Sequence, residues 1–551
     1  MPQDNRTSAL IQFLIFWQGA LTLAALAGIA ALWGGAFTTG LAAQLGGSIL
    51  LLGAAIASGY AIPLLRARNH RGRLIAFAVN YLGFLVSFLY ALHIMGVFLG
   101  IDTLADTFGK GVLWLGGVML GYLISAFGDR YDNYPQRQKF FRRAGGALMV
   151  LFGALFLIAV GIFPALGYLL GQLTQLLPLL FTVFAALFAF SLWILNRPQT
   201  AHAFHAKVSH EEMISGYLFL SPNLLGFLFF FAGPLLLSLY FSFTNWDAFG
   251  THDWIGLQNY AKILDLTIAR LQTPNQIFTE VIDAARYSEL FRFNVFGNWF
   301  LVGAQDKLFW LALRNTFVFG LLTVPLSVVP ALLLANLLNS KLPGMKFFRA
   351  VYFLPSIAAV VGIALVWQWL YNAAVGYINY FITVGVNFVN SFGFMLIDPQ
   401  IRWLSDSRTA LLAVVIMAAW QWMGFNTVLF LAGLQNIPGE LYEAATVDGA
   451  GAWGKFWNVT LPLLAPTTFF VLTTSIIQAL QVFEQVYVLI PTEPPGGPNN
   501  ATLTLVLYLY QKGFQRFEQG YASAVAWVLF LIIFVFTLFQ FRNQRSSAYE
   551  N

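Results

Sequence analysis

A run of uncharged residues from Ala144 to Asn196 is the feature that most restricts what this chain can fold into. A helix needs about 20 apolar residues to cross the hydrocarbon core of a membrane, so this run is long enough for two crossings. Only 9% of all residues are charged, against about 25% in water-soluble domains. The sequence therefore predicts an all-α, polytopic membrane protein with about twelve transmembrane helices. The apolar stretches lie at about 10–33, 46–65, 74–99, 111–127, 144–168, 176–195, 213–243, 308–338, 350–372, 409–434, 463–490 and 519–541.

Lys and Arg are unevenly divided between the two sides of these predicted helices. The termini and the loops after even-numbered helices hold 18 of the 29. Cytoplasmic loops of membrane proteins carry such an excess of Lys and Arg. We therefore expect a protein of the cytoplasmic (inner) membrane with both termini in the cytoplasm. The same distribution accounts for the net charge of +6 without a nucleic-acid partner.

A polar linker at residues 201–212 separates six predicted helices from six. We expect an N-terminal membrane region at 1–200 and a second domain at 213–545. His202, His205 and His210 could bind a metal, but no group of carboxylates accompanies them, so we favour an ordinary cytoplasmic linker. The second domain has a long loop at about 244–307, rich in charge and aromatics, which we expect to form a small, partly helical extracytoplasmic subdomain.

The residues themselves argue against cysteine chemistry, ion-driven transport and ATP binding by this chain. Cysteine is absent, which removes disulfides, thiolate metal sites and cysteine nucleophiles. Ion-driven carriers need ionisable residues at depth, and here Glu484 is the clearest acid within a predicted helix. Residues 449–455 match the start of a phosphate-binding loop, but Phe456 stands where Ser or Thr must bind magnesium, and no strand precedes it. We therefore expect that the energy for this protein's action comes from another chain, and that this chain is not an enzyme.

The loop at 435–462 reads as a compact helix–turn–helix between two membrane helices. Pro438 suits a first helical turn, and Glu440 and Glu443 then lie near a helix N-terminus, where the dipole favours acids. Gly449 is a natural helix stop with positive φ. A second short helix is expected to about Asn458, with Pro462 opening the next membrane helix. The simplest alternative is a connector lying on the membrane surface.

The loop contains Glu443-Ala444-Ala445, then three residues, Gly449, nine residues and Val459-Thr460-Leu461-Pro462. This pattern resembles the EAA signature of ABC-importer permeases, although the family has Ile where Val459 stands. Further motifs of carbohydrate-type permeases extend the resemblance over about 213–545. It is closest to the larger permease subunit of maltose-type, binding-protein-dependent sugar importers. Residues 1–200 show no comparable resemblance. The further motifs are Tyr240–Trp246, Gly256–Tyr260, Arg314-Asn315-Thr316, Arg349-Ala350 with Phe353-Leu354-Pro355, Gly496-Gly497-Pro498 and Gly520–Ala524.

The resemblance implies a type I ABC-importer core whose loop docks into a cytoplasmic ATPase. Glu443 would make the polar contact, Ala444 and Ala445 the close packing, and Gly449 the bend, with Leu461 and Pro462 completing the motif. It also implies two ATPase subunits, a second permease subunit, different and shorter, and an extracytoplasmic sugar-binding protein. No cofactor is expected on this chain, because ATP and magnesium would be used by the ATPase. Membrane lipids complete the expected partners.

The cargo route is predicted from polar residues within the membrane helices. Gln478, Gln481 and Gln485 are spaced to share one helical face, with Glu484 beside them. Such groups should face protein or a wet cavity rather than lipid. Either they line the route or they join helices by hydrogen bonds, and the aromatics could equally form an interfacial belt or pack between helices. The other candidates are Gln368, Tyr371, Trp422 and Asn426.

Two further questions stay open in the sequence. The loop at 244–307 and the segment at 490–500 could dock the sugar-binding protein, or be plain connections. The cargo could be a mono- or oligosaccharide, or another solute such as glycerol phosphate. The near absence of Lys and Arg from the predicted helices favours a neutral sugar. A secondary carrier is a more distant alternative, which the coupling motif opposes.

Overall fold

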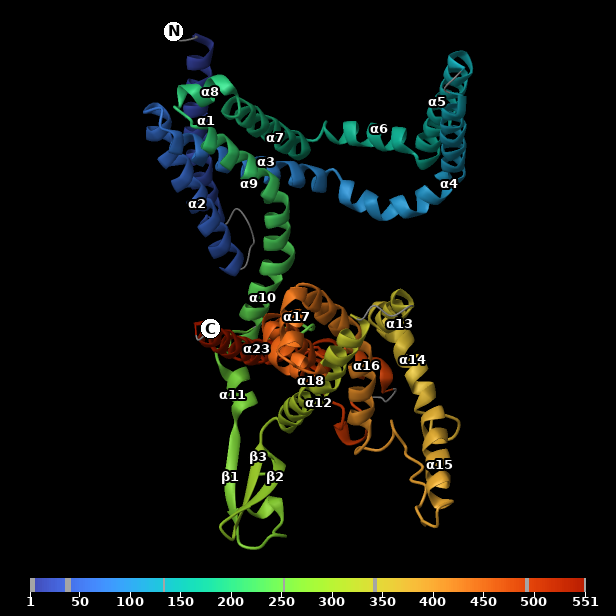
Figure 1. The fold of residues 1–551 in the computed structure, drawn as a ribbon. Coiled ribbons are helices and arrows are strands. Elements are labelled where there is room, and N and C mark those ends of the chain that lie inside the picture. Colours follow the sequence, from blue (N-terminus) through green and yellow to red (C-terminus); the bar gives the residue numbers. More distant parts are fainter. Residues whose placement is uncertain are drawn as a thin grey trace. The chain divides into compact units, whose positions relative to one another are not determined.

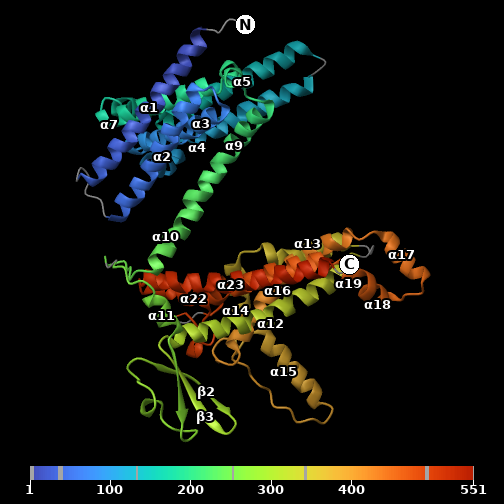
Figure 2. The ribbon, with the colours of Figure 1, turned by 90° about the vertical axis from the view of Figure 1, so that its left-hand side faces the viewer.

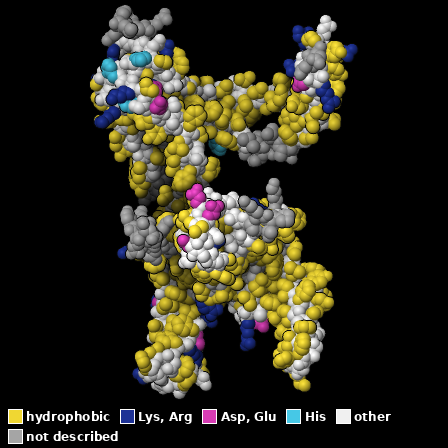
Figure 3. All heavy atoms as spheres, viewed as in Figure 1, with side chains coloured by type: hydrophobic (Ala, Val, Ile, Leu, Met, Phe, Trp, Pro, Cys, Tyr) yellow, Lys and Arg dark blue, Asp and Glu magenta, His cyan; other side chains and the backbone are white. Residues whose placement is uncertain are grey.

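A computed structural model describes residues 5–34, 41–131, 134–250, 253–339, 344–490 and 495–549. The chain forms two compact units, Met1–Leu224 and Leu225–Asn551, and each is described by itself (Figure 1). Ten described helices are long and apolar enough to cross a membrane, and two bent helix pairs raise that number to twelve. The mostly helical, polytopic prediction is therefore confirmed. In Figure 3, hydrophobic side chains cover most of the visible surface, as a lipid environment requires.

The first unit is built from pairs of long helices. α1 packs on α2, α3 on α7, and α4 on α5. Arg73 of α3 is fully buried: its Nε donates to the carbonyl oxygen of Leu195, and its terminal nitrogens pair with the carboxylate of Glu211 on α9. The elements are α1 (Asn5–Trp33), α2 (Leu41–Arg66), α3 (His70–Ile94), α4 (Val97–Phe127), α5 (Pro135–Val160), α6 (Ile162–Gln172), α7 (Leu176–Leu195), α8 (Pro198–Ala203) and α9 (Val208–Phe227).

One predicted helix of this unit, at 144–168, is wrong in its bounds. α5 starts earlier and ends at Val160, because Gly161 takes a φ of 83°, which turns the chain out of the helix. The short helix α6 follows. The apolar pattern could not show this break, since the residues on both sides are equally apolar.

The second unit has a helical core centred on α16. Most of the core side chains come from α16 and from the helices around it. Figure 2 shows the loop helices α17 and α18 at one end of this helical layer and the β-sheet at the other. The elements are α10 (Gly233–Ser242), α11 (Gln258–Leu264), α12 (Lys307–Leu338), α13 (Met345–Ile357), α14 (Val360–Leu370), α15 (Tyr377–Asn390), α16 (Ala410–Gln435), α17 (Gly439–Val447), α18 (Ala452–Lys455), α19 (Leu461–Leu463), α20 (Ala465–Leu480), α21 (Glu484–Leu489), α22 (Leu505–Tyr510) and α23 (Gln519–Tyr549).

The loop at 244–307 is a small antiparallel sheet more than a helical subdomain. Strands β1 (Leu266–Leu271), β2 (Ser288–Val295) and β3 (Asn298–Ala304) are arranged in the order β1-β3-β2. Phe296 and Gly297 form the two-residue turn of the β2–β3 hairpin, with φ of 48° and 83°. Two positive φ values in such a turn match the right-handed twist of the flanking strands. The expectation of helix holds for the short α11 and for a 3-10 turn at Phe278–Glu280.

Two predicted membrane helices are interrupted. The helix expected at 350–372 consists of α13 and α14, bent by 98°, because Ala358 and Ala359 have extended backbones. The helix expected at 463–490 ends at Leu480 and resumes as α21. It is preceded by a 68° bend at Leu464, so Pro466, rather than Pro462, stands in the first turn of α20.

Candidate functional site

The loop at 435–462 is closed by local hydrogen bonds. α17 begins after Pro438, which takes the N-cap position rather than the first turn. Its end is a Schellman motif: the amide of Gly449 donates to the carbonyl of Thr446 (3.0 Å), and that of Ala450 to the carbonyl of Ala445 (2.9 Å). Gly449 has the expected positive φ, 79°. The turn is therefore preformed by its own sequence.

The two arms of the loop are also joined to each other. The hydroxyls of Tyr442 on α17 and Thr460 lie 2.9 Å apart. Thr460 is buried and closes the π-helical turn Phe456–Thr460, which continues into α19. Leu461 and Pro462 therefore belong to the second arm. Glu443 and Ala444 are exposed and Ala445 is half-buried, which leaves one face of α17 open.

A cavity of about 870 Å³ lies where the two interrupted helices meet. Ala358 and Ala359 line it from the α13–α14 break, and α21 lines it from the other break. The hydroxyl of Thr504 donates to the freed carbonyl of Val482 (3.0 Å). Within a membrane, non-helical backbone is tolerated where it is buried in protein or lines a water-filled cavity. Both breaks therefore lie where non-helical backbone is tolerated, at the wall of a cavity.

The cavity collects some of the predicted pathway residues. Gln478, Glu484, Gln485 and Trp422 line it. Gln485 is buried, and its Nε2 donates to Oε1 of Gln421 (3.3 Å), whereas Gln478 and Glu484 are exposed to the cavity. Trp422 is also buried and packs edge-to-face on Phe319, at 5.9 Å between ring centroids.

The single helical face predicted for the three glutamines is wrong. Gln481 caps the end of α20, and the chain leaves the helix before Glu484. Gln481 is exposed and is not in the cavity lining. Asn426 is not in that lining either: its Nδ2 lies 3.5 Å from the hydroxyl of Ser327 and 3.3 Å from that of Ser475, as an interhelical contact.

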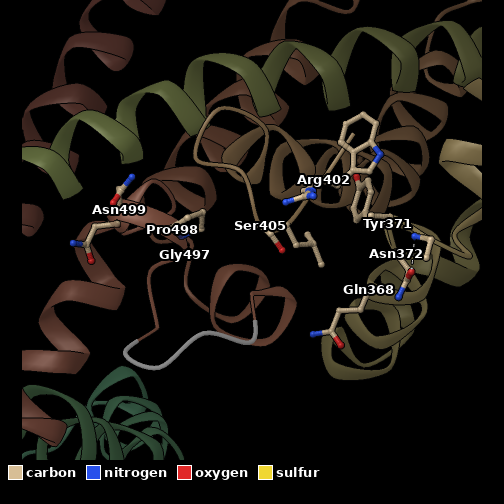
Figure 4. A pocket seen from close by; sticks show the side chains of 13 residues that line it. Gln368, Tyr371, Asn372, Arg402, Ser405, Gly497, Pro498 and Asn499 are labelled. Carbon is tan, nitrogen blue, oxygen red and sulfur yellow. Dashed lines mark hydrogen bonds between the residues drawn. The ribbon is translucent and has the colours of Figure 1, made fainter. Parts of the chain in front are cut away.

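Gln368 and Tyr371 line a second pocket, of about 950 Å³. Figure 4 shows them on one side, Gly497–Asn499 on the opposite side, and Arg402 and Ser405 between. Gln368 Nε2 donates to the carbonyl of Val488 (2.7 Å), and the Tyr371 hydroxyl donates to that of Ala413 (2.9 Å). The predicted residues are thus divided between two pockets. Of the predicted docking segment at 490–500, residues 491–494 lie outside the described part.

Residues of both pockets were missed in the sequence. Ser356 and Tyr487 line the first, and Arg402 and Asn499 the second. Ser356 and Arg402 gave no signal, because their places depend on a helix break and on an irregular segment.

A third cluster joins the sheet to the helical core. Asp306 follows β3 and accepts a hydrogen bond from the amide of Phe309 (3.1 Å), which caps α12. Its other oxygen accepts hydrogen bonds from the hydroxyls of Tyr508 and Tyr521. All three residues are buried. An acid directly before an apolar helix is a recognisable N-cap signal, but its tyrosine partners, about 200 residues away, are not.

Comparison with known proteins decides the family. Residues 313–547 match the family of binding-protein-dependent transport system inner membrane components. The permease YesP of Bacillus subtilis, named as a probable ABC transporter permease, is 34% identical over 335 residues, which cover 60% of this chain and 91% of YesP. The chain belongs to the binding-protein-dependent ABC transport permeases.

Two further relatives of this permease carry the names of their cargoes. The lactose transport permease LacF of Rhizobium radiobacter is 37% identical over 44% of this chain and 78% of its own length. The sn-glycerol-3-phosphate transport permease UgpA of Agrobacterium fabrum is 31% identical over 61% of this chain and 96% of its own length. The protein is thus a multi-pass inner-membrane subunit of an ABC importer, in which a separate subunit hydrolyses ATP.

Proposed function

We propose that this permease imports a sugar, and that its cargo passes through the cavity between the two interrupted helices. The observation that carries this is the meeting of both breaks at one cavity that holds amides, aromatic rings and a carboxylate. Interrupted helices line the substrate sites of many transporters. Sugars are bound by such aromatic faces and hydrogen-bonding groups.

The charge of the cavity favours a neutral cargo. Glu484 is the one charged residue among those that line it. A carboxylate repels a phosphate group, whereas it accepts hydrogen bonds from sugar hydroxyls. Glycerol phosphate is the second candidate, because UgpA is a relative and because Arg402 lines the other pocket.

Coupling to the ATPase is proposed for the loop at 435–462. Glu443 would give the directional contact, Ala444 and Ala445 the close approach, and the Gly449 turn the rigid bend. Both pockets and the sheet lie within the second unit, and we assign the permease domain to about 213–545. With both termini in the cytoplasm, this loop would face the ATPase.

The remaining subunits follow from the single coupling loop. One such loop calls for a second permease chain, which we propose to be different and shorter, together with two ATPase subunits. We propose that the extracytoplasmic sugar-binding protein docks on the sheet and on the 495–500 segment. The exposed apolar side chains of the sheet, such as Phe291 and Phe296, are suited to protein contact.

The first test is a mild-detergent purification of the chain from its native membrane, with mass spectrometry of the proteins that accompany it. Recovery of an ATPase and a second permease is expected. The cargo is then tested by competing uptake in the reconstituted complex with lactose and with sn-glycerol-3-phosphate. Competition by glycerol phosphate alone would contradict the neutral sugar and leave the importer intact.

A further inference from the structure

The N-terminal unit contains a cavity whose position and chemistry differ from those of the pockets above. It lies between α3, α7 and α9 and has a volume of about 430 Å³. This is within the range of small-molecule sites, roughly 300–1,000 Å³. Its walls are largely apolar, and include Phe77, Phe84, Leu192 and Leu218.

A cation stands at one end of this cavity. Arg197 lies just beyond the end of α7, and its guanidinium carbon is 4.5 Å from the centroid of the Trp193 ring, which also lines the cavity. No carboxylate pairs with Arg197 in the described part of the chain. Stacking on the ring fixes the plane of the guanidinium but leaves its N–H donors available.

The position of the cavity within the thickness of the membrane follows from the sequence of α7. This helix is apolar over Leu176–Leu195, and Asn196 and Arg197 are its first strongly polar successors. Trp and Arg at the end of a membrane helix lie at the level of the lipid headgroups. The apolar part of the cavity therefore faces the acyl chains, and Arg197 faces the phosphates.

We propose that this cavity binds an anionic phospholipid, with the phosphate diester on Arg197 and part of one acyl chain against Phe77, Phe84 and Leu218. A neutral sugar does not fit, because the walls offer little beyond the side chains of Tyr81 and Asn196 for hydroxyl groups. A zwitterionic lipid fits less well, because its ammonium group meets the unpaired cation. The positive charge of Arg197 therefore selects a headgroup with net negative charge.

The site would give the N-terminal unit a role in transport. Leu218 belongs to α9, the helix through which the chain continues into the second unit. The Tyr81 hydroxyl lies 2.6 Å from that of Ser221 on the same helix, so α3 and α9 are already joined beside the cavity. A bound lipid would add a contact between α9 and α7, and hold the start of the permease domain in place.

The experiment uses the full chain, purified with its accompanying subunits and reconstituted in nanodiscs of equimolar phosphatidylglycerol and phosphatidylcholine. After extraction into detergent, native mass spectrometry counts the retained lipids. Wild type is expected to retain phosphatidylglycerol preferentially. Arg197→Gln should lower that retention about five-fold, the effect of one basic residue near an anionic surface. Arg197→Lys should lower it less.

Two further variants separate this site from general attraction to the membrane. Arg137→Gln is the matched control, because Arg137 also lies over an aromatic ring (Tyr134, 5.5 Å) in the same unit but outside this cavity. Leu218→Trp keeps the cation and fills the apolar part, and should also release the lipid. Equal retention of both lipids by wild type, or equal loss in Arg137→Gln and Arg197→Gln with unchanged thermal midpoints, would overturn the proposal.

Discussion

The amide of Ala450 donates a hydrogen bond to the carbonyl of Ala445, and this bond closes the turn of the 435–462 loop with Gly449 at a φ of 79°. Gly449→Ala should strain this turn by about 1 kcal/mol, because a Cβ disfavours the left-handed region. A Cβ there meets no atom within 4 Å, so the backbone alone is tested. We expect lower cargo-stimulated ATPase activity in the reconstituted complex, with normal membrane insertion.

Gly451→Ala is the control for this change. Gly451 lies two residues further on, also in open space, but its φ is −70°, which any residue adopts. Its substitution should leave ATPase activity unchanged. Equal activity of the two variants would mean that the shape of this turn does not matter for coupling.

A charge reversal tests the proposed contact with the ATPase. Glu443→Lys should weaken co-purification of the ATPase and lower uptake, since the exposed carboxylate is the proposed polar contact. Glu440→Lys changes the same charge one turn earlier on α17, where it mainly affects the helix dipole, by about 0.3–1 kcal/mol. The two variants are compared by the amount of ATPase recovered per permease. Normal uptake with Glu443→Lys would remove this residue from the contact.

The loop at 435–462 could be predicted in detail because its structure is local. The helix stop at Gly449 depends on residues within five positions of it, and the sequence shows all of them. Two helix starts differ slightly from the prediction. Pro438 is the N-cap of α17 rather than part of its first turn, and α20 begins at Ala465 rather than at Pro462. The approximate number of membrane helices was also predictable, since lipid demands long apolar stretches.

The helix breaks could not be predicted because they depend on distant residues. Val482 leaves the helix where Thr504, from another segment, supplies a hydrogen bond, and the local sequence does not show this partner. The glutamine face therefore looked continuous in the sequence although Gln481 and Gln485 lie on different helices. The sheet was missed for a related reason. Its strands are short and pair with one another within a loop that is rich in charged residues, and we expected such a loop to be partly helical.

The division of the glutamines gives a direct comparison within the proposed cargo route. Glu484→Gln removes the one charge of the cavity while keeping its shape, and should lower uptake of a neutral sugar several-fold through lost charge-assisted hydrogen bonds. Gln481→Leu, outside the cavity lining, should have a smaller effect than Gln478→Leu, inside it. Uptake by all three reconstituted variants is measured at matched protein levels. A larger loss with Gln481→Leu would place the route elsewhere.

The sheet should respond to acid through one ion pair. Both Arg292 nitrogens that donate to Glu289 do so within 3.0 Å, and this hydrogen bonding lowers the pKa of the Glu289 carboxyl. A lowered pKa in the folded state adds stability above the ordinary value of about 4.3, and that stability is lost as the pH falls through the lower value. Glu289→Gln should therefore flatten the acid side of the sheet's stability curve, measured by hydrogen exchange of β2 and β3 amides. An unchanged slope would show that the pair contributes nothing measurable, as many exposed pairs do.

The buried carboxylate of Asp306 should contribute more to stability than any exposed ion pair. Asp306→Ala removes the cap of α12 and leaves the hydroxyls of Tyr508 and Tyr521 without their acceptor. A lost cap costs about 1 kcal/mol, and each unsatisfied buried hydroxyl costs about 1–3 kcal/mol. The Tyr521→Phe variant removes one hydroxyl together with its need for a partner and should cost much less. Thermal unfolding of the purified complex compares the variants. In the double variant Asp306→Ala/Tyr521→Phe, the loss should be smaller than the sum of the single losses, because the residues form one network.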